Sequence, residues 1–259
     1  EQKAAYEIGL WLEFRRVLFR SARVLPHWDT SIPGYGYIKG LYAFGLEESG
    51  DYQAAERWGR EAVDDNPSDI WATHAVTHVF EMQERPDEGM TWIDELSKEW
   101  TGMNNFTFHV WWHRALFSLE KERYDEVLTL YDTQFRATQT EEYLDMTNAI
   151  AMLWRLESRG VNVGDRWEEL ADLSEQRTQG HLLYFADAHF IMALARAGRT
   201  EAIQEMLASL RQAAQRDDTQ CQVIARVGLT LAEAIVSFHQ GRFAAALQRL
   251  LPRSEARRV

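Results

Sequence analysis

Two pairs of histidines are the residues of this chain whose types and spacing are best suited to chemistry. They are His74 with His78 and His109 with His113, both inside sequence of strong helical character. A four-residue spacing puts both imidazoles of a pair on one face of a helix, one turn apart. Glu81 continues the face of the first pair. If the two helices pack side by side, four imidazoles and a carboxylate converge on one surface.

Three interpretations of these histidines are open. In the first, the imidazoles bind one another, backbone carbonyls and carboxylates in a polar seam, because buried polar groups need partners. In the second, aromatic walls hold the apolar body of a ligand while His and Asp side chains fix its polar groups. In the third, the histidines bind a metal or catalyse a reaction, with Glu81 as a third ligand. The catalytic Glu of His-Glu-x-x-His enzymes is absent between His74 and His78.

Other catalytic motifs are absent from the sequence. It has no G-x-x-x-x-G-K-[ST] loop for phosphate and no G-x-S-x-G nucleophile turn. Cys221, the single cysteine, has no histidine near it in sequence, which favours a packing role over a nucleophilic one. We therefore assign no catalytic residue, no metal ligand and no cofactor from the sequence alone, and an enzyme is the less favoured class.

Composition narrows the choice of partners and compartment. The 259 residues carry a formal net charge of −12, which argues against nucleic acid because phosphate binding needs clustered Lys and Arg. A single cysteine excludes an intrachain disulfide and favours a reducing compartment, so we expect a cytoplasmic protein. No unbroken apolar run of about eighteen residues occurs, and the first residues lack the pattern of a signal peptide. We therefore expect no membrane partner.

Both ends of the chain contain segments that resemble translated sequencing adapters. Residues 13–21 read EFRRVLFRS, and residues 253–259 read RSEARRV, which differs by one residue from the translation of the opposite adapter. Such segments are excluded from reasoning about the fold. We expect residues 1–21 and 253–259 to be artefactual or misplaced, and the natural sequence to span residues 22–252.

Helical patterns fill the sequence, with no convincing strand alternation. A short punctuation recurs between the helical runs: a residue suited to ending a helix, followed by a small or apolar residue on the packing face of the next helix. Placing Ala55, Gly89 and Val127 in equivalent positions gives spacings of 34 and 38 residues, which indicates repeated helix pairs. The punctuation occurs in EESGDYQAA (47–55), ERPDEG (84–89), KERYDEV (121–127), RAGRTEAI (196–203) and HQGRFAAA (239–246).

This pattern resembles the tetratricopeptide repeat, a helix–turn–helix unit of about 34 residues. In the first unit, Ala43, Ala55, Ala62 and Pro67 match its small-residue and closing-proline positions. Longer stretches such as DIWATHAVTHVFEMQ and FHVWWHRALFSLEKERYDEVLTLYD resemble the tetratricopeptide repeat protein 38-like family, over nearly all of residues 22–252. The resemblance implies an all-α, right-handed superhelix of about five or six stacked helix pairs in one domain. It implies no particular reaction.

In repeats of this kind, the first helix of each pair lines a concave groove. The resemblance therefore implies a groove rich in aromatic and histidine side chains, with scattered carboxylates. The candidate ligand-binding residues in it are Tyr37, Phe44, Glu47, His74, His78, Glu81, His109, Trp112, His113, Asp145, Asp187 and His189.

The leading interpretation is a cytoplasmic binding or scaffold protein whose groove takes a peptide or a small molecule. The alternative is a histidine-rich enzyme or metal-binding protein with its site in the same groove. Dispersal of the histidines along an open trough favours the first interpretation, and their convergence within a few ångströms, together with an enclosed pocket, favours the second. Six deciding groups distinguish the two interpretations by their positions: His74, His78, Glu81, His109, His113 and His189.

Overall fold

A computed structural model describes residues 21–255 of the chain, with side chains up to residue 251. Residues 1–20 and 256–259, which hold most of the two adapter-like segments, lie outside the described residues. All regular structure from residue 21 to residue 255 is helical and none is strand, so the all-α prediction is confirmed. The backbone contacts divide the chain into two compact units, with the boundary in sequence between Phe135 and Arg136, and one domain over residues 22–252 stays a prediction. Each unit is described by itself.

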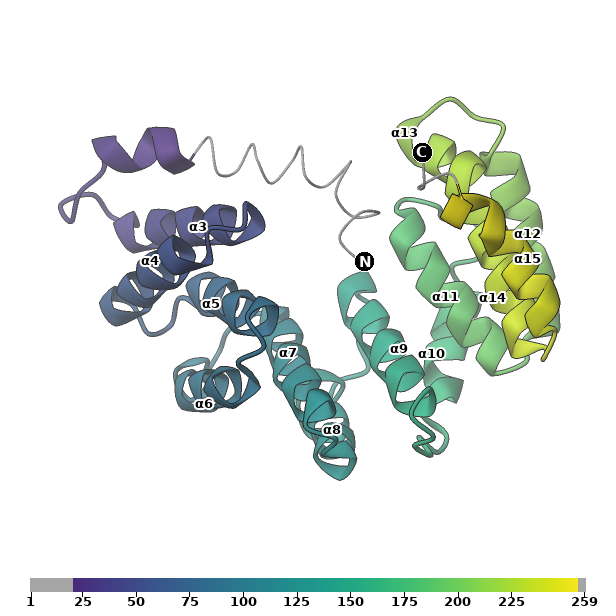
Figure 1. The fold of residues 1–259 in the computed structure, drawn as a ribbon, viewed down its shortest axis with the longest axis horizontal. Helices are drawn as coiled ribbons and strands as arrows, with labels where there is room; N and C mark the ends of the chain where they lie inside the picture. The colour runs from purple at the N-terminus through teal and green to yellow at the C-terminus, as the bar shows by residue number, and fades with distance from the viewer. Residues whose placement is uncertain (1–20, 256–259) are drawn as a thin grey trace. The chain divides into compact units, whose positions relative to one another are not determined.

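The first unit is a series of helix pairs (Figure 1). Within each pair the two helices pack together, and α5 also packs against α3 and α7, so the first helices of successive pairs are neighbours. The short η1 (Leu25–His27) precedes the first pair, η2 (Ser97–Glu99) lies between the second and third pairs, and a π-helical turn, η3 (Tyr131–Phe135), follows the last pair. The pairs are α3 (Tyr35–Glu48) with α4 (Tyr52–Asp65), α5 (Ile70–Met82) with α6 (Pro86–Leu96), and α7 (Phe106–Glu120) with α8 (Tyr124–Leu130).

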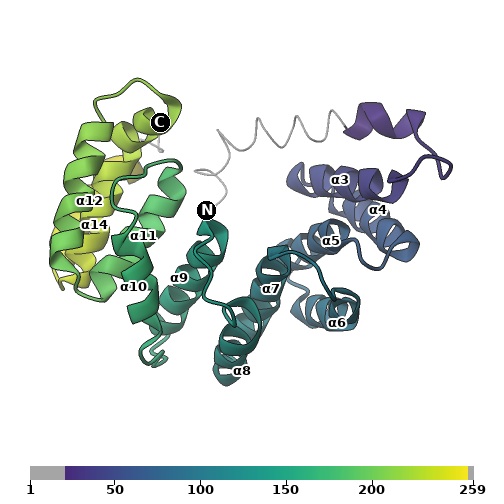
Figure 2. The same ribbon diagram turned by 180° about the vertical axis from the view of Figure 1, so that it is seen from behind.

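The second unit follows the same plan (Figure 2). Here α11 packs against both α9 and α14, which repeats the contact between first helices seen in the first unit. Its helices are α9 (Tyr143–Glu157), α10 (Arg166–Glu175), α11 (Tyr184–Arg196), α12 (Thr200–Ala213), α13 (Thr219–Val223), the π-helical η4 (Ile224–Gly228), α14 (Leu229–His239) and α15 (Phe243–Glu255).

One kind of turn closes five of the helix pairs, at the five places where the punctuation was predicted. Three residues separate the helices, and the N–H of the third donates to a carbonyl near the end of the first helix, as Asp51 does to Leu46 at 3.0 Å. The middle residue has a positive φ, which glycine adopts freely and other residues at a cost of roughly 1–2 kcal/mol. These middle residues are Gly50 (84°), Glu84 (57°), Glu122 (58°), Gly198 (69°) and Gly241 (72°).

The fourth residue of each helix after such a turn is buried, as the equivalent positions predicted. Ala55, Val127, Ile203 and Ala246 have at most 7% of their surface exposed, and Gly89 is buried as well. At Gly89 the approach is closest, because an added Cβ would lie 2.3 Å from the Phe117 ring. Gly89 therefore lets α6 approach α7, the first helix of the next pair, closely.

One helix in the described part of the chain, Thr219–His239, is long and apolar enough to span a membrane by length and composition. Its most apolar window has a mean hydropathy of 1.5, and 39% of that window is buried inside the protein. The sequence has no unbroken apolar run of this length, which predicted no such helix. That prediction was too strong, because a window that contains a few polar residues can still have a high mean hydropathy. Core helices of folded domains pass the same test.

Candidate metal centre

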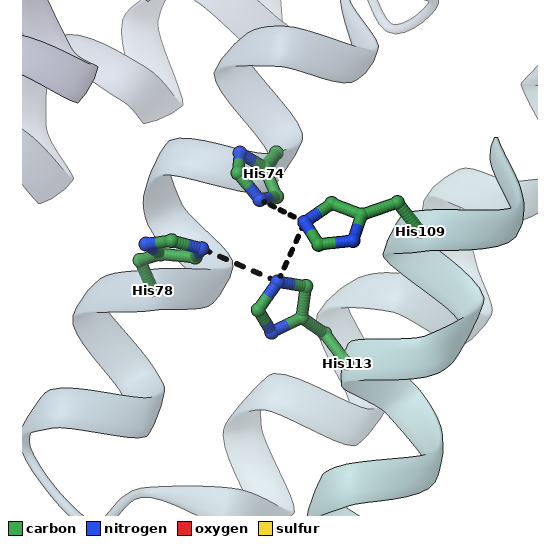
Figure 3. A group of neighbouring side chains, drawn as sticks. All are labelled: His74, His78, His109 and His113. Carbon is green, nitrogen blue, oxygen red and sulfur yellow. Dashed lines mark hydrogen bonds between the residues drawn. The ribbon is translucent and has the colours of Figure 1, made fainter. Parts of the chain in front are cut away.

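The four histidines of the two pairs meet between α5 and α7 (Figure 3). His74 Nε2 lies 3.0 Å from His109 Nε2, and His78 Nε2 lies 3.2 Å from His113 Nε2. A third contact of 3.2 Å joins the Nε2 atoms of His109 and His113. One nitrogen from each ring belongs to a group whose members all lie within 4.8 Å of one another. We call these four residues the histidine cluster.

Local sequence explains why α5 and α7 present these rings to each other. The Asp69 carboxylate caps α5 by accepting from the N–H groups of Trp71 at 3.1 Å and Ala72 at 3.0 Å, which satisfies donors that the helix leaves unpaired. Both helices keep an apolar face between them and α6, with Phe80 and Phe117 fully buried. Burying such a side chain contributes about 1.5–3 kcal/mol. The packing of that face aligns the histidine faces.

Two carboxylates lie beside the outer nitrogens of two of the four rings, His113 and His78. His113 Nδ1 donates to Glu81 Oε2 at 2.9 Å, and His78 Nδ1 lies 3.4 Å from Glu47 Oε2. A carboxylate only accepts, so it keeps the proton on Nδ1 and leaves the Nε2 lone pair of a neutral ring directed into the cluster. This is the outer-shell arrangement found around histidines that bind metals.

The pKa values show how the cluster holds protons. Burial lowers the pKa of His74 well below its ordinary value, and the other three imidazoles lower it further. Burial also lowers the pKa of His113, although Glu81 opposes this. Burial acts in the same direction on His78, but Glu47 and further carboxylates raise its pKa above the ordinary value. Neutral rings therefore predominate at His74 and His113, and of these three rings His78 carries a proton most readily.

A carboxyl pair lies beside His78. Burial, followed by the charge of Glu47, raises the pKa of Glu48 to about 7. Glu47 is 6% exposed, and its Oε2 has no hydrogen-bond partner among the described residues. Glu47, Glu48 and His78 form a second group whose ligand atoms lie within 4.8 Å of one another. Glu48 was not among the residues predicted from sequence.

Aromatic side chains surround the histidine cluster. The Phe44 ring centroid lies 5.6 Å from that of His74, and Trp112 stacks on His109 at 5.7 Å with 15° between the ring planes. Phe106 lies 5.1 Å from His74, and Trp71 stacks on Phe106 at 4.0 Å. These apolar rings reduce the contact of the imidazoles with water, although Trp71 is 47% exposed, and so strengthen the interactions of charges beside them.

The residues predicted for the first unit are mostly brought together. Among the six deciding groups, His74, His78, Glu81, His109 and His113 converge, and Phe44, Glu47 and Trp112 adjoin them. Tyr37 is different: it lies in the first turn of the helix that contains Phe44, about two turns away, and is 53% exposed.

The residues predicted for the second unit have local partners. Thr140 Oγ1 donates to the buried Asp145, and His189 Nδ1 donates to the Phe185 carbonyl at 2.8 Å. Asp187 lies 3.1 Å from Nδ1 of His181. His189, the sixth deciding group, lies in this unit, so its distance from the cluster stays untested.

Asp187 belongs to a chain of contacts that sequence reasoning missed. His181 Nε2 lies 2.8 Å from Ser209 Oγ, so Ser209, His181 and Asp187 have the contacts of an acyl-transfer triad. Ser209 lies inside α12, however, where backbone N–H groups are committed to the helix and cannot form an oxyanion hole. His181 and Asp187 also border an open pocket of about 370 Å³. It is lined by Tyr143, Arg177, Gly180, His181, Leu182, Leu183, Ala186, Asp187 and Phe190.

No protein-family model matches the chain, and no solved structure matches it.

Proposed function

We propose that this protein binds a divalent transition-metal ion through the four Nε2 atoms of the histidine cluster. The observation that carries the proposal is the spacing of those atoms. Metal–nitrogen bonds of about 2.0–2.1 Å in a tetrahedron place neighbouring nitrogens about 3.3–3.4 Å apart. The three separations of 3.0–3.2 Å are within a few tenths of an ångström of that value. The other three pairs of rings have ligand nitrogens within 4.8 Å of one another, and rotation of the rings would bring them to the tetrahedral separation.

A polar seam without metal leaves more of the ring nitrogens without a good partner than a metal ion does. His113 Nδ1 donates to Glu81, so Nε2 of the neutral ring has one lone pair and no proton. That nitrogen nevertheless has two neighbours at 3.2 Å, His78 Nε2 and His109 Nε2. One lone pair accepts one good hydrogen bond, and the other contact stays unsatisfied. A metal ion uses all four inward lone pairs at once.

The donor set selects the class of metal. Four imidazoles without a thiolate suit Zn²⁺, Co²⁺, Ni²⁺ or Cu²⁺, whereas Ca²⁺ and Mg²⁺ prefer oxygen ligands. A tetrahedral arrangement with four protein ligands favours Zn²⁺. Four-coordinate sites of this kind are structural, because no position stays open for a substrate. The metal then joins α5 to α7 and stabilises the contact between two successive helix pairs.

We also propose that the helix pairs form a right-handed tetratricopeptide-like superhelix, as in the tetratricopeptide repeat protein 38-like family. The recurring three-residue turns and the contacts between first helices of successive pairs support this. A peptide- or ligand-binding role is the second candidate function, favoured by the apolar pocket beside Asp187. A cytoplasmic location stays a prediction from the single cysteine.

Metal analysis of matched variants tests the proposal. We expect the full chain, stripped with chelator and titrated with Co²⁺, to develop the visible absorption of a tetrahedral nitrogen site and to melt at a higher temperature. His113→Gln and His109→Gln should each lose the absorption. His27→Gln should keep it, because His27 is exposed in η1, far along the chain from the cluster.

The contrary results are equally clear. A folded full chain that binds neither Co²⁺ nor Zn²⁺ would overturn the proposal. So would an unchanged spectrum in His113→Gln. If both cluster variants fail to fold, X-ray absorption of the zinc-loaded wild-type chain decides, with four nitrogen neighbours at about 2.0 Å expected and a mainly oxygen shell contradicting the proposal.

A further inference from the structure

We infer that a second divalent cation binds beside the histidine cluster, held by Glu47 and Glu48 of α3 and by His78 of α5. The inference rests on the proposed function, because His78 belongs to both sites. The ligand atoms of these three residues lie within 4.8 Å of one another. Two carboxylate oxygens and one imidazole nitrogen suit Zn²⁺, Mn²⁺, Co²⁺ or Cu²⁺.

The two carboxylates lie at the C-terminal end of α3, where a nearby cation is favourable. Glu47 and Glu48 are the last two residues of α3, and no basic residue lies in that turn. The C-terminal end of a helix carries partial negative charge, which disfavours nearby carboxylates. Glu47 is also 6% exposed, with Oε2 lacking a hydrogen-bond partner among the described residues. His78 Nδ1, 3.4 Å from Glu47 Oε2, carries at most one positive charge, whereas a divalent cation compensates both carboxylates.

His78 can serve both sites because its ring has a nitrogen on each side. Its Nε2 lies 3.2 Å from His113 Nε2, inside the histidine cluster, and its Nδ1 lies 3.4 Å from Glu47 Oε2. When the second cation binds, the bond from Nδ1 to hydrogen is replaced by a bond from Nδ1 to the metal, and the proton leaves to the buffer. The ring then bridges two cations as an imidazolate. Two carboxylates and the imidazolate together offset the charge of the second ion.

The two sites differ in ligand number, which sets their order of filling. The histidine cluster offers four ligands and the carboxylate site three, so we expect the first ion to occupy the cluster. The competing account is that Glu47 and Glu48 share a proton instead of a cation. The two accounts differ in the number of metal ions bound per chain.

The test is metal stoichiometry in the full chain. Metal-free protein titrated with Cu²⁺ should bind two equivalents, the second more weakly. Two copper ions joined by an imidazolate couple magnetically, so the electron paramagnetic resonance signal per copper should decrease when the second ion binds. Glu48→Gln should bind one equivalent and keep the full signal. Glu61→Gln, an exposed carboxylate of α4, should behave as the wild type.

The other possible results contradict different parts of the proposal. Wild-type protein that stops at one equivalent overturns the second site and leaves the histidine cluster intact. Wild-type protein that binds no metal overturns the proposed function together with this inference. Two equivalents retained in Glu48→Gln overturn the assignment of that carboxylate. If Glu48→Gln does not fold, Glu47→Gln replaces it, with the same single equivalent expected.

Discussion

At the scale of single residues, the outer carboxylates decide what the imidazoles can do. His113 shows this most directly, because Glu81 fixes its Nδ1 proton and leaves Nε2 free to bind a metal. A negative acceptor also makes the ring a stronger donor toward a cation. Glu81 therefore contributes to affinity without touching the metal.

Replacing Glu81 separates its charge from its hydrogen bond. Glu81→Gln keeps an oxygen that accepts from His113 Nδ1 but loses the negative charge, so we expect metal affinity to fall by roughly 10-fold. Competition with a chromophoric chelator measures the change. Glu95→Gln, an exposed carboxylate of α6, is the matched control and should show wild-type affinity. Equal affinities in the two variants would contradict the role given to Glu81.

At the scale of elements, α5 is the helix on which the site depends most. It contributes His74 and His78, and it packs against its own partner α6 as well as against α3 and α7. The distance between helix pairs is set by small residues at their contacts. Gly89 on α6 is one of them, since its α-carbon faces the Phe117 ring of α7.

A methyl group at Gly89 tests this packing. The added Cβ would lie 2.3 Å from Phe117, so the ring or the helix must move. We expect Gly89→Ala to lower the free energy of unfolding by about 1–3 kcal/mol, measured by urea denaturation. Gly36→Ala is the control, because nothing lies within 4 Å of its added Cβ and alanine favours helix. A loss of stability of the same size in both variants would contradict the packing argument.

At the scale of the whole molecule, buried histidines link stability to pH in both units. Burial lowers the pKa of four of them: His74, His113, His189 and His239, the last to about 4. In the unfolded chain these groups bind protons at their ordinary value of 6.5. Below that pH the unfolded state holds more protons, so stability decreases as pH falls.

The metal-free chain should therefore melt at a lower temperature at pH 5 than at pH 7. Glu48 opposes this, because its raised pKa of about 7 makes the folded state take up a proton above the ordinary value of 4.5. His78 opposes it only above pH 6.5, since its pKa is raised. Burial also raises the pKa of Asp69, which opposes the histidines in the same sense as Glu48. We expect the four histidines to outweigh these two carboxyl groups between pH 6.5 and 4.5. Calorimetry in chelator-containing buffers measures the shift, and a melting temperature that rises on acidification would refute the prediction.

Local features of this protein were predictable from sequence because they depend on neighbours along the chain. The spacing of His74 and His78 puts both rings on one helix face wherever that helix lies. The turns at Gly50, Gly198 and Gly241 follow from the freedom of glycine at positive φ. For the same reason the all-α class and the equivalence of the buried positions could be predicted.

Only the tertiary structure decided which faces meet. The 3.2 Å contact of His78 with His113 joins residues 35 apart in sequence, and it exists because α5 packs on α7. The contact of His181 with Ser209 was missed because His181 lies between helices, where no periodicity indicates its direction. Helix spacing aligns side chains within one element, whereas apolar packing between elements sets the distances of a few ångströms on which a metal centre depends.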